Sequence, residues 1–263
     1  MTSPCCFAVL AVLLTLSGGT RLTRGAGPVD ALPRDKFHLY LLVGQSNMAG
    51  RGKMTAADHE PVEGVFMLDA SGTWQPARHP LHDDKPTIAG VGLGLSFAEV
   101  MRAHDSGAVI GLIPCAVGGT RIDQWAKGGK LYMNAIDRAR RGASDGVVRG
   151  ILWHQGESDS TEELAPMYYE RLELLIADFR HDLETPTLPV VLGELGRFRQ
   201  EKYPFTGGIN KHLQQVSDQT PHVALASSAG LVDQGDATHL DADSLRAFGR
   251  RFAEQMLSLE QVP

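Results

Sequence analysis

The sequence predicts an α/β fold built on a parallel β-sheet that helices cover on both faces. The chain has 263 residues, of which 43% are hydrophobic and 21% charged, so it can bury the core of one sizeable domain. Short runs of strand-forming apolar residues recur along it. Between several of these runs lie segments whose apolar residues repeat with helical spacing, and this alternation is typical of parallel sheets.

Six apolar runs after residue 35 have the length and composition of β-strands. They span Phe37–Val43, Val65–Leu68, Val109–Ile113, Val147–Trp153, Val190–Leu192 and Val223–Ala226. Residues 54–88 lack a clean period. We expect this long excursion to wall a substrate cleft.

Four segments have the spacing of helices. They are Leu95–Ala103, the segment after Ser160, Ile209–Val216, and a last one from about Asp243 to Leu257. The second is the clearest, because Ser160 and Glu163 fit a capping box and an apolar face follows. No repeat or interdomain linker divides the chain, so residues 36–263 are expected to form a single domain.

Residues 7–16 form an apolar run that is too short to span a bilayer but matches the hydrophobic part of a signal peptide. Small residues follow, and cleavage near Ala26 would leave residues 27–35 as a short linker. We therefore expect a secreted or periplasmic protein with no membrane contact once residues 1–26 are removed. No Lys or Arg precedes the run, so a buried core segment or a wrongly chosen start codon is the alternative.

The net charge of −6 and the absence of a Lys/Arg-rich run argue against nucleic acid as a partner. Cys5 and Cys6 would leave with the signal, so the mature chain keeps Cys115 alone and can form no internal disulfide. Cys115 follows an apolar run and is expected to be a small buried residue. His154 has no partner at a familiar metal-ligand spacing, so we expect neither a metal nor another cofactor. The sequence does not indicate an oligomeric state.

Four segments rich in polar residues or glycine lie just past strand ends, at residues 44–47, 116–125, 153–160 and 234–244. Ligand sites of open parallel sheets lie at the carboxyl ends of the strands. We therefore expect these segments to meet at one edge of the sheet.

Ser46 and His239 are the candidate nucleophile and base. A serine hydroxyl needs a base to take its proton. Asp236 precedes His239 by three residues, so its carboxylate can fold back onto one ring nitrogen and leave the other free. Each feature alone is common in surface turns, and the Gly-x-Ser-x-Gly elbow of α/β-hydrolases is absent around Ser46.

An oxyanion needs hydrogen-bond donors. The backbone N–H of Ser46 is one candidate if this residue starts a helix. Gly118 or Gly119 offers an amide that no side chain obstructs, and Gln155 offers a side-chain N–H₂.

The segments GQSNMAGRG, PCAVGGTRIDQW, WHQGESD and DATHLDADSLRAFGRR, in this order and spacing, resemble the SGNH/GDSL hydrolase superfamily. More narrowly, the chain is similar to its sialate O-acetylesterase-related branch, which includes the carbohydrate esterase family of acetylxylan esterases. The resemblance runs from about Phe37 to the C-terminal helix. It implies a three-layer α/β/α sandwich with a flavodoxin-like central parallel sheet. It also implies a cofactor-free serine esterase that removes O-acetyl groups from acetylated carbohydrates through an acetyl-enzyme intermediate.

The resemblance also assigns roles to individual residues. It makes Ser46 the nucleophile, His239 the base, and Ser46, Gly118 or Gly119, and Gln155 the oxyanion donors. Most of the superfamily has Asn where this branch and this chain have Gln155. Glu157 lies where some members place an acidic partner, so Asp236 and Glu157 both remain candidates to orient the imidazole, with Asp236 favoured.

Further residues in or near the segments that carry these groups are candidate substrate contacts. They are Gln45, Asn47, Arg121 and Trp125. Asn47 is also expected to secure the turn through a local bond, and Gln45 to tie the oxyanion loop. Arg121 with Asp123 could equally be a surface pair, and Trp125 could equally be a core residue.

Two other functions remain alternatives. A lipase- or thioesterase-like hydrolase of the same superfamily would act on other acyl esters and need an extended apolar groove. A carbohydrate-binding protein without catalysis would be expected to lack Ser46 or His239, and both are present.

Overall fold

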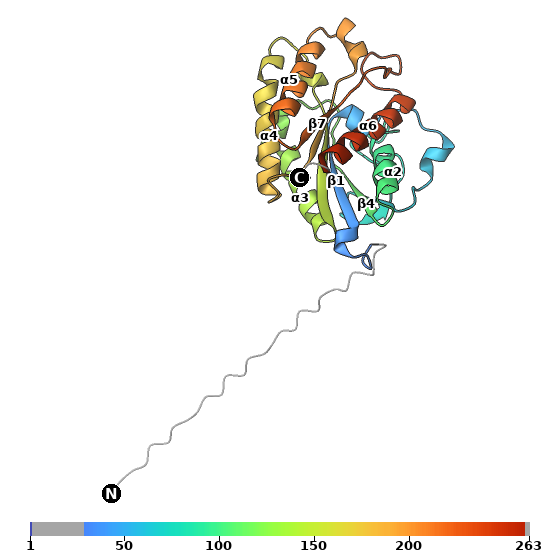
Figure 1. The fold of residues 1–263 in the computed structure, drawn as a ribbon, viewed down its shortest axis with the longest axis vertical. Coiled ribbons are helices and arrows are strands. Elements are labelled where there is room, and N and C mark those ends of the chain that lie inside the picture. The colour runs from blue at the N-terminus through green and yellow to red at the C-terminus, as the bar shows by residue number, and fades with distance from the viewer. Residues whose placement is uncertain (2–28, 261–263) are drawn as a thin grey trace.

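A computed structural model of the chain describes Met1 and residues 29–260 (Figure 1). These residues form a sheet of seven strands between two layers of helices (Figure 1). The predicted signal peptide, apart from Met1, and residues 27–28 of the predicted linker lie outside the described residues.

The strands lie in the order β3-β2-β4-β1-β5-β6-β7, and all neighbouring pairs are parallel except β2 and β3. Their bounds are β1 Phe37–Gly44, β2 Val65–Leu68, β3 Trp74–Pro76, β4 Val109–Pro114, β5 Val147–His154, β6 Val190–Gly193 and β7 Val223–Ala226. The six predicted strands agree with these bounds to within one residue, and the predicted fold class is confirmed. The sequence missed β3, which is three residues long and lies in the excursion at residues 54–88.

Helices α2 and α6 cover one face of the sheet, and α3, α4 and α5 cover the other (Figure 1). The α-helices are α1 Ser46–Ala49, α2 Gly94–His104, α3 Lys130–Ala143, α4 Tyr168–Asp182, α5 Thr206–Gln219 and α6 Ala242–Glu260. Short 3₁₀ turns lie at Arg34–Lys36, Ala56–His59, Ile122–Trp125, Glu157–Asp159, Ala165–Met167 and Arg197–Glu201.

One helix prediction needs correction, and one helix was missed. The helix expected after Ser160 begins only at Tyr168, because the Ser160 hydroxyl donates to the Gly156 carbonyl at 2.9 Å and does not cap a helix. Helix α3 was not predicted. Its buried residues Tyr132, Ala135, Ile136 and Ala139 have helical spacing, so the signal was present in the sequence.

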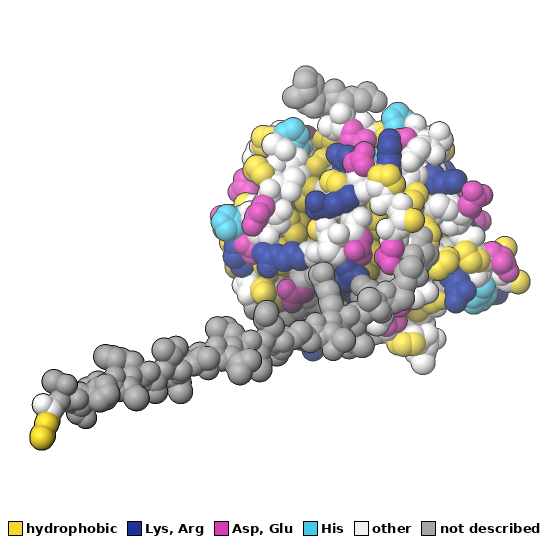
Figure 2. All heavy atoms as spheres, turned by 90° about the horizontal axis from the view of Figure 1, so that it is seen from below, with side chains coloured by type: hydrophobic (Ala, Val, Ile, Leu, Met, Phe, Trp, Pro, Cys, Tyr) yellow, Lys and Arg dark blue, Asp and Glu magenta, His cyan; other side chains and the backbone are white. Residues whose placement is uncertain are grey.

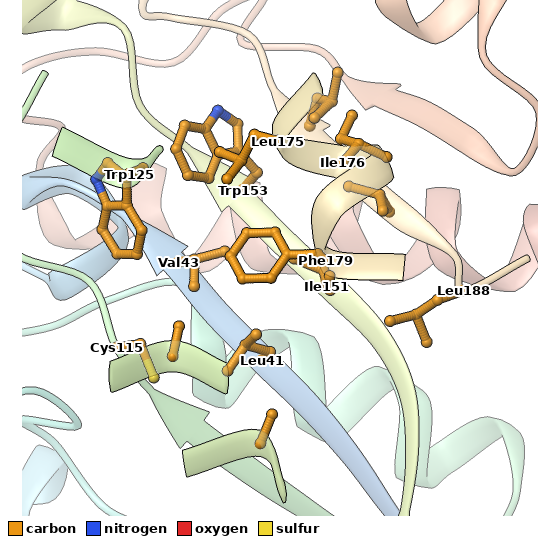
Figure 3. Packing of buried hydrophobic residues seen from close by; sticks show 14 of the residues in the cluster. Leu41, Val43, Cys115, Trp125, Ile151, Trp153, Leu175, Ile176, Phe179 and Leu188 are labelled. Carbon is orange, nitrogen blue, oxygen red and sulfur yellow. The ribbon is translucent and has the colours of Figure 1, made fainter. Parts of the chain in front are cut away.

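The apolar layer under α4 fixes the carboxyl ends of the central strands. Figure 3 shows Phe179 of α4 reaching over β1 and β5, close to Val43 and Ile151. Beside them the rings of Trp125 and Trp153 meet edge to face at 5.6 Å. This contact anchors the turn that follows β4 to the end of β5.

Figure 2 shows the molecule from below, where the amino ends of the parallel strands lie. The described part of this face carries both acidic and basic side chains, and neither charge dominates it. Among the described residues, no helix is both long enough and apolar enough to cross a membrane.

The crossing of α6 over α2 gives a test of the packing. A Cβ built on Gly249 would lie 2.2 Å from the Leu93 carbonyl oxygen and 3.0 Å from the Phe97 amide nitrogen. Because both are backbone atoms, we expect Gly249→Ala to push the helices apart and lower the free energy of unfolding by about 1–3 kcal/mol. Urea denaturation measures this change.

The matched control is Gly208→Ala in α5, where a built Cβ meets nothing within 4 Å. It should raise the free energy of unfolding by about 0.4–1 kcal/mol, since alanine restricts the unfolded chain more than glycine does. Equal stability of the two variants would show that α6 does not approach α2 this closely.

Candidate active site

The four polar segments meet at the carboxyl edge of the sheet, the upper edge in Figure 1. Ser46 follows β1 directly, and residues 116–125 and 155–160 follow β4 and β5. A Cβ built on Gly118 would lie 3.4 Å from the Ser46 Cβ. The loop that precedes α6 brings His239 to the same place, 3.1 Å from Ser46.

Strand β1 ends at Gly44 for a steric reason. Gly44 has a φ of +133°, and a Cβ there would lie 2.1 Å from the His154 carbonyl oxygen. The Gln45 N–H donates to that same carbonyl at 2.9 Å. The chain therefore turns against the end of β5, and Ser46 becomes the first residue of α1.

Ser46, His239 and Asp236 form a continuous hydrogen-bonded chain. The Ser46 Oγ lies 3.1 Å from His239 Nε2, and His239 Nδ1 lies 2.6 Å from Asp236 Oδ2. The other carboxylate oxygen accepts the N–H groups of Thr238 and His239 at 2.8 and 2.7 Å. Burial alone would raise the pKa of Asp236, but these hydrogen bonds lower it to about 2. Asp236 is therefore a carboxylate at neutral pH.

A second set of contacts holds the loop that carries His239. The Asp233 carboxylate accepts the N–H of Ala237 at 2.5 Å, and the Gln234 N–H donates to the His239 carbonyl at 2.9 Å. Ala237 has a positive φ of 56°, a conformation that a side chain disfavours. The loop is thus held in one shape by its own hydrogen bonds.

Asn47 fastens this loop to the serine. Its Oδ1 accepts the Leu240 N–H at 2.9 Å, and its Nδ2 donates to the Thr238 carbonyl at 3.1 Å and to Glu157 Oε1 at 2.6 Å. Asn47 is only 2% exposed. The expectation of a local turn bond is therefore wrong, and the structure gives no support to a substrate contact at Asn47.

Glu157 lies in the same network but not at His239. Its Oε1 accepts from Asn47 and lies 3.5 Å from His154 Nε2. Burial alone would raise the pKa of Glu157, but His154, Arg199 and the Asn47 hydrogen bond lower it to about 2. Of the two candidate acids, Asp236 is the one that contacts the His239 ring.

The predicted oxyanion donors differ in availability. Gln155 is fully buried, and its Nε2 is shared among the Thr120 carbonyl at 2.9 Å, Asp159 Oδ2 at 2.5 Å and Gln45 Oε1 at 3.2 Å. Its amide therefore braces the loops after β4 and β5, and its role as an oxyanion donor stays a prediction.

The backbone candidates also differ from one another. The Gly118 N–H donates to Asp84 Oδ2 at 2.7 Å, so it is occupied in this structure. The N–H groups of Ser46 and Gly119 make no hydrogen bond to any other described residue. These two N–H groups, one on Ser46 itself and one on the residue after Gly118, are therefore not engaged by the described residues.

The sequence analysis missed the Arg51–Asp84 pair. Arg51 Nη2 lies 2.6 Å from Asp84 Oδ2, with side chains only 3% and 4% exposed. Burial alone would raise the pKa of Asp84, but the hydrogen bonds from Arg51 and the Gly118 amide lower it. Arg51 lies inside the segment GQSNMAGRG, and Asp84 lies inside residues 54–88, which were expected to wall the cleft. Each residue therefore belonged to a segment with a predicted function, but nothing in the sequence indicated that the two would pair.

The other expected substrate contacts are occupied within the protein. Trp125 is fully buried and its Nε1 donates to Thr120 Oγ1 at 3.1 Å, so it is a core residue and cannot stack on a sugar. Gln45 is 3% exposed and ties the Gln155 amide. Arg121 is exposed and pairs with Asp123 at 3.1 Å, the surface pair that the sequence had left open.

Cys115 is buried and unpaired. Burial raises the pKa of its thiol to about 11, so the thiol is not an activated nucleophile. Within residues 29–260, no group of three or more His, Cys, Asp or Glu side chains is arranged to hold a metal ion.

A profile of the family described as "Carbohydrate esterase, sialic acid-specific acetylesterase" (SASA) matches residues 36–258. The chain belongs to this carbohydrate esterase family. The predicted branch and enzyme class are thereby confirmed: the esterase is a carboxylic ester hydrolase of O-acetylated carbohydrates.

One relative and two solved structures illustrate the similarity. The esterase is 33% identical over 265 residues to "Probable carbohydrate esterase At4g34215" of Arabidopsis thaliana, covering 92% of this chain and 99% of the relative. The X-ray structure of the protein from that Arabidopsis locus superposes with a TM-score of 0.77 and 30% identity, over 86% of this chain and 99% of the other. NanS has the same fold, with a TM-score of 0.71 at 17% identity over 87% of this chain and 98% of its own.

The Arg51–Asp84 pair yields a test at the site. Asp84→Ala leaves a buried guanidinium without its partner, and we expect the free energy of unfolding to fall by about 3–5 kcal/mol. Chemical denaturation of Asp84→Ala, Arg51→Met and the Arg51→Met/Asp84→Leu double variant measures the coupling.

The double variant should recover most of the lost stability, because it removes both buried charges together. Its esterase activity should stay low, since the Gly118 amide has lost the carboxylate that holds it. A cost below about 1 kcal/mol for Asp84→Ala would mean that the pair behaves as a solvent-screened surface ion pair.

Proposed function

We propose that this esterase is a serine enzyme that removes acetyl groups through an acetyl-Ser46 intermediate. The observation that carries the proposal is the hydrogen-bonded chain from Ser46 Oγ through the His239 imidazole to Asp236. In this arrangement Asp236 holds the tautomer that leaves Nε2 free to accept the serine proton.

In the first half-reaction, Ser46 Oγ attacks the ester carbonyl carbon while His239 Nε2 takes the hydroxyl proton. The carbonyl π bond becomes the oxyanion, and its collapse breaks the bond to the sugar oxygen. His239 returns its proton to that oxygen, so the sugar leaves as an alcohol and the acetyl group stays on Ser46.

In the second half-reaction, a water molecule takes the place of the sugar. His239 Nε2 removes a proton from the water as its oxygen attacks the acetyl carbon. Collapse of this second oxyanion releases acetate, and the proton on His239 returns to Ser46. No cofactor enters either half-reaction.

The unoccupied N–H groups of Ser46 and Gly119 support a role as oxyanion donors. Each such donor is worth about 10²- to 10³-fold in rate. Gln155 would contribute indirectly, because its amide holds in place the loops around these groups.

The substrate that we propose is an O-acetylated saccharide, such as acetylxylan or an O-acetylated sialic acid. The family description names sialic acid, and a structural neighbour from Xanthomonas citri is described as a carbohydrate acetylesterase. The apolar run at residues 7–16 supports secretion as the route to an extracellular glycan.

Replacement of the nucleophile tests the mechanism. Ser46→Ala should fold as the wild type does but release acetate from acetylated saccharides at least about 10³-fold more slowly, because no acyl-enzyme can form. An acetate-release assay over a panel of acetylated glycans, with circular dichroism to check folding, measures both properties. A folded Ser46→Ala variant with wild-type turnover would falsify the serine mechanism.

Replacement of the two acids separates their roles. Asp236→Asn should lower kcat by about 10²- to 10⁴-fold, because the imidazole loses the carboxylate that fixes its tautomer. Glu157→Gln keeps an oxygen for Asn47 and should lose less than about tenfold. The reverse order of effects would assign the orienting role to Glu157.

The pH dependence of folding gives a second readout for Asp236. Its pKa of about 2 in the folded protein lies below the ordinary value of 3.8. The stabilisation from its ionised form is therefore complete above pH of about 4 and is lost as the pH falls through about 2. Asp236→Asn should remove this part of the acid-induced loss of stability, as measured by denaturation between pH 2 and pH 5.

A further inference from the structure

A cavity of about 380 Å³ lies at the carboxyl ends of β2 and β4, and its lining reaches Val117 but does not include Ser46 or His239. Its walls come from the end of β2, residues 80–89, the end of β4 and helix α3. Volumes of about 300–1,000 Å³ are typical of sites for small organic molecules.

The cavity and the nucleophile share a wall. Asp84 and Val117 both line the cavity, and Asp84 Oδ2 accepts the N–H of Gly118 at 2.7 Å. Gly118 in turn approaches Ser46, since a Cβ built on it would lie 3.4 Å from the Ser46 Cβ. Gly118 and the Asp84 carboxylate therefore lie between Ser46 and the cavity.

The lining combines apolar surface with polar groups at the rim. Pro80, Leu81 and Ala116 supply apolar surface, while Asp83 and Asn134 are exposed polar residues. A pyranose ring presents C–H faces and hydroxyl groups together and so matches such a lining. A long acyl chain would contact the apolar part of the lining but could make no hydrogen bond to the polar groups.

The charges of the lining disfavour a carboxylate. Arg138 is the cation of the lining, and its Nη1 and Nη2 already donate to the carbonyls of Asp69 and Leu68 at 2.9 and 2.6 Å. Asp83 adds a negative charge at the rim, and the negative charge of Asp84 is already paired with Arg51. Lys85 does not line the cavity; its Nζ would lie 3.8 Å from a Cβ built on Gly119.

We propose that this cavity is the saccharide subsite of the esterase and that it takes an uncharged sugar ring in preference to a sialic acid. The proposal rests on the proposed function, because it assumes that the acetyl carbonyl lies at Ser46. It assigns substrate preference to residues 80–89 and to the end of β2, both of which lie far from Ser46 in the sequence.

Two filling variants test the location. Ala70→Trp and Ala89→Trp introduce a large ring at two different places in the cavity wall. Gln215→Trp is the matched control, because it adds the same ring to a separate hollow of about 320 Å³ between α4 and α5. The substrates are acetylated xylose, ethyl acetate, which has no sugar, and ethyl octanoate, and the measured quantity is kcat/KM.

The ratio of kcat/KM for acetylated xylose to that for ethyl acetate should fall at least about tenfold in both filling variants and stay at the wild-type value in the control. An unchanged ratio in both filling variants would overturn the subsite. Selective loss of octanoate hydrolysis would overturn it as well, since the cavity would then hold the acyl chain. Two positions are used so that misfolding of one variant leaves the other to decide.

The charge preference has its own test. The wild type should hydrolyse acetylated xylose at least about tenfold more efficiently than O-acetylated N-acetylneuraminic acid. Asp83→Lys should raise the relative rate on the sialic acid about threefold, the effect expected of one rim charge. Faster hydrolysis of the sialic acid by the wild type, with loss of that activity in Lys85→Ala, would overturn the preference for an uncharged ring.

These outcomes are distinct from failure of the proposed function. Undiminished hydrolysis of ethyl acetate by Ser46→Ala would remove the serine mechanism whatever the filling variants do. Loss of ethyl acetate hydrolysis in Ser46→Ala, together with an unchanged ratio in the filling variants, would remove the subsite alone.

Discussion

The active-site geometry depends on the hydrogen bonds of one side chain, Asn47. It joins the start of α1 to Glu157, 110 residues away, and to the His239 loop, which lies more than 190 residues away. The lone cysteine among the described residues forms no disulfide, so these contacts are not reinforced by a covalent link. Because Ser46 precedes Asn47 directly, the same side chain that positions the loop also sets the distance from serine to imidazole. A change in its three hydrogen bonds would therefore alter the distance between Ser46 and His239, on which the proposed mechanism depends.

Around Asn47 the protein buries further polar groups, whose burial would cost free energy if they had no hydrogen-bond partners. The Gln155 amide bridges two loops, and the Arg51–Asp84 pair holds the Gly118 backbone. Such groups contribute little to stability compared with an apolar core, yet removal of one partner is strongly destabilising. The arrangement therefore favours a single geometry of the loops over maximal stability, which is the requirement of a site that must hold donors and a nucleophile in fixed relation.

The sequence predicted the features that local patterns determine. The bounds of the six predicted strands were right to within one residue, because most of these apolar runs end at glycine or polar residues. The serine, histidine and aspartate that the structure joins by hydrogen bonds were predicted from spacing and resemblance. The roles of Asn47, Gln155 and Trp125 were not predictable in this way. Each depends on a partner in another segment, and a side chain that is polar or aromatic in the sequence carries no mark of whether it faces substrate or a neighbouring loop. The same reason hid the pairing of Arg51 with Asp84.

Asp84 connects the proposed catalytic serine to the proposed saccharide subsite. Its carboxylate holds the Gly118 amide beside Ser46 and also forms part of the wall of the proposed subsite. A substitution of Asp84 would therefore change the backbone beside Ser46 together with the shape of the cavity, and its effects on rate and on preference could not be separated. Asp83 and Ala89 lie on the same segment without a hydrogen bond to Gly118. If the cavity is the saccharide subsite, Asp83 and Ala89 can change substrate preference without loss of the hydrogen bond to Gly118, whereas Asp84 cannot, because its carboxylate serves both the loop beside Ser46 and the cavity wall.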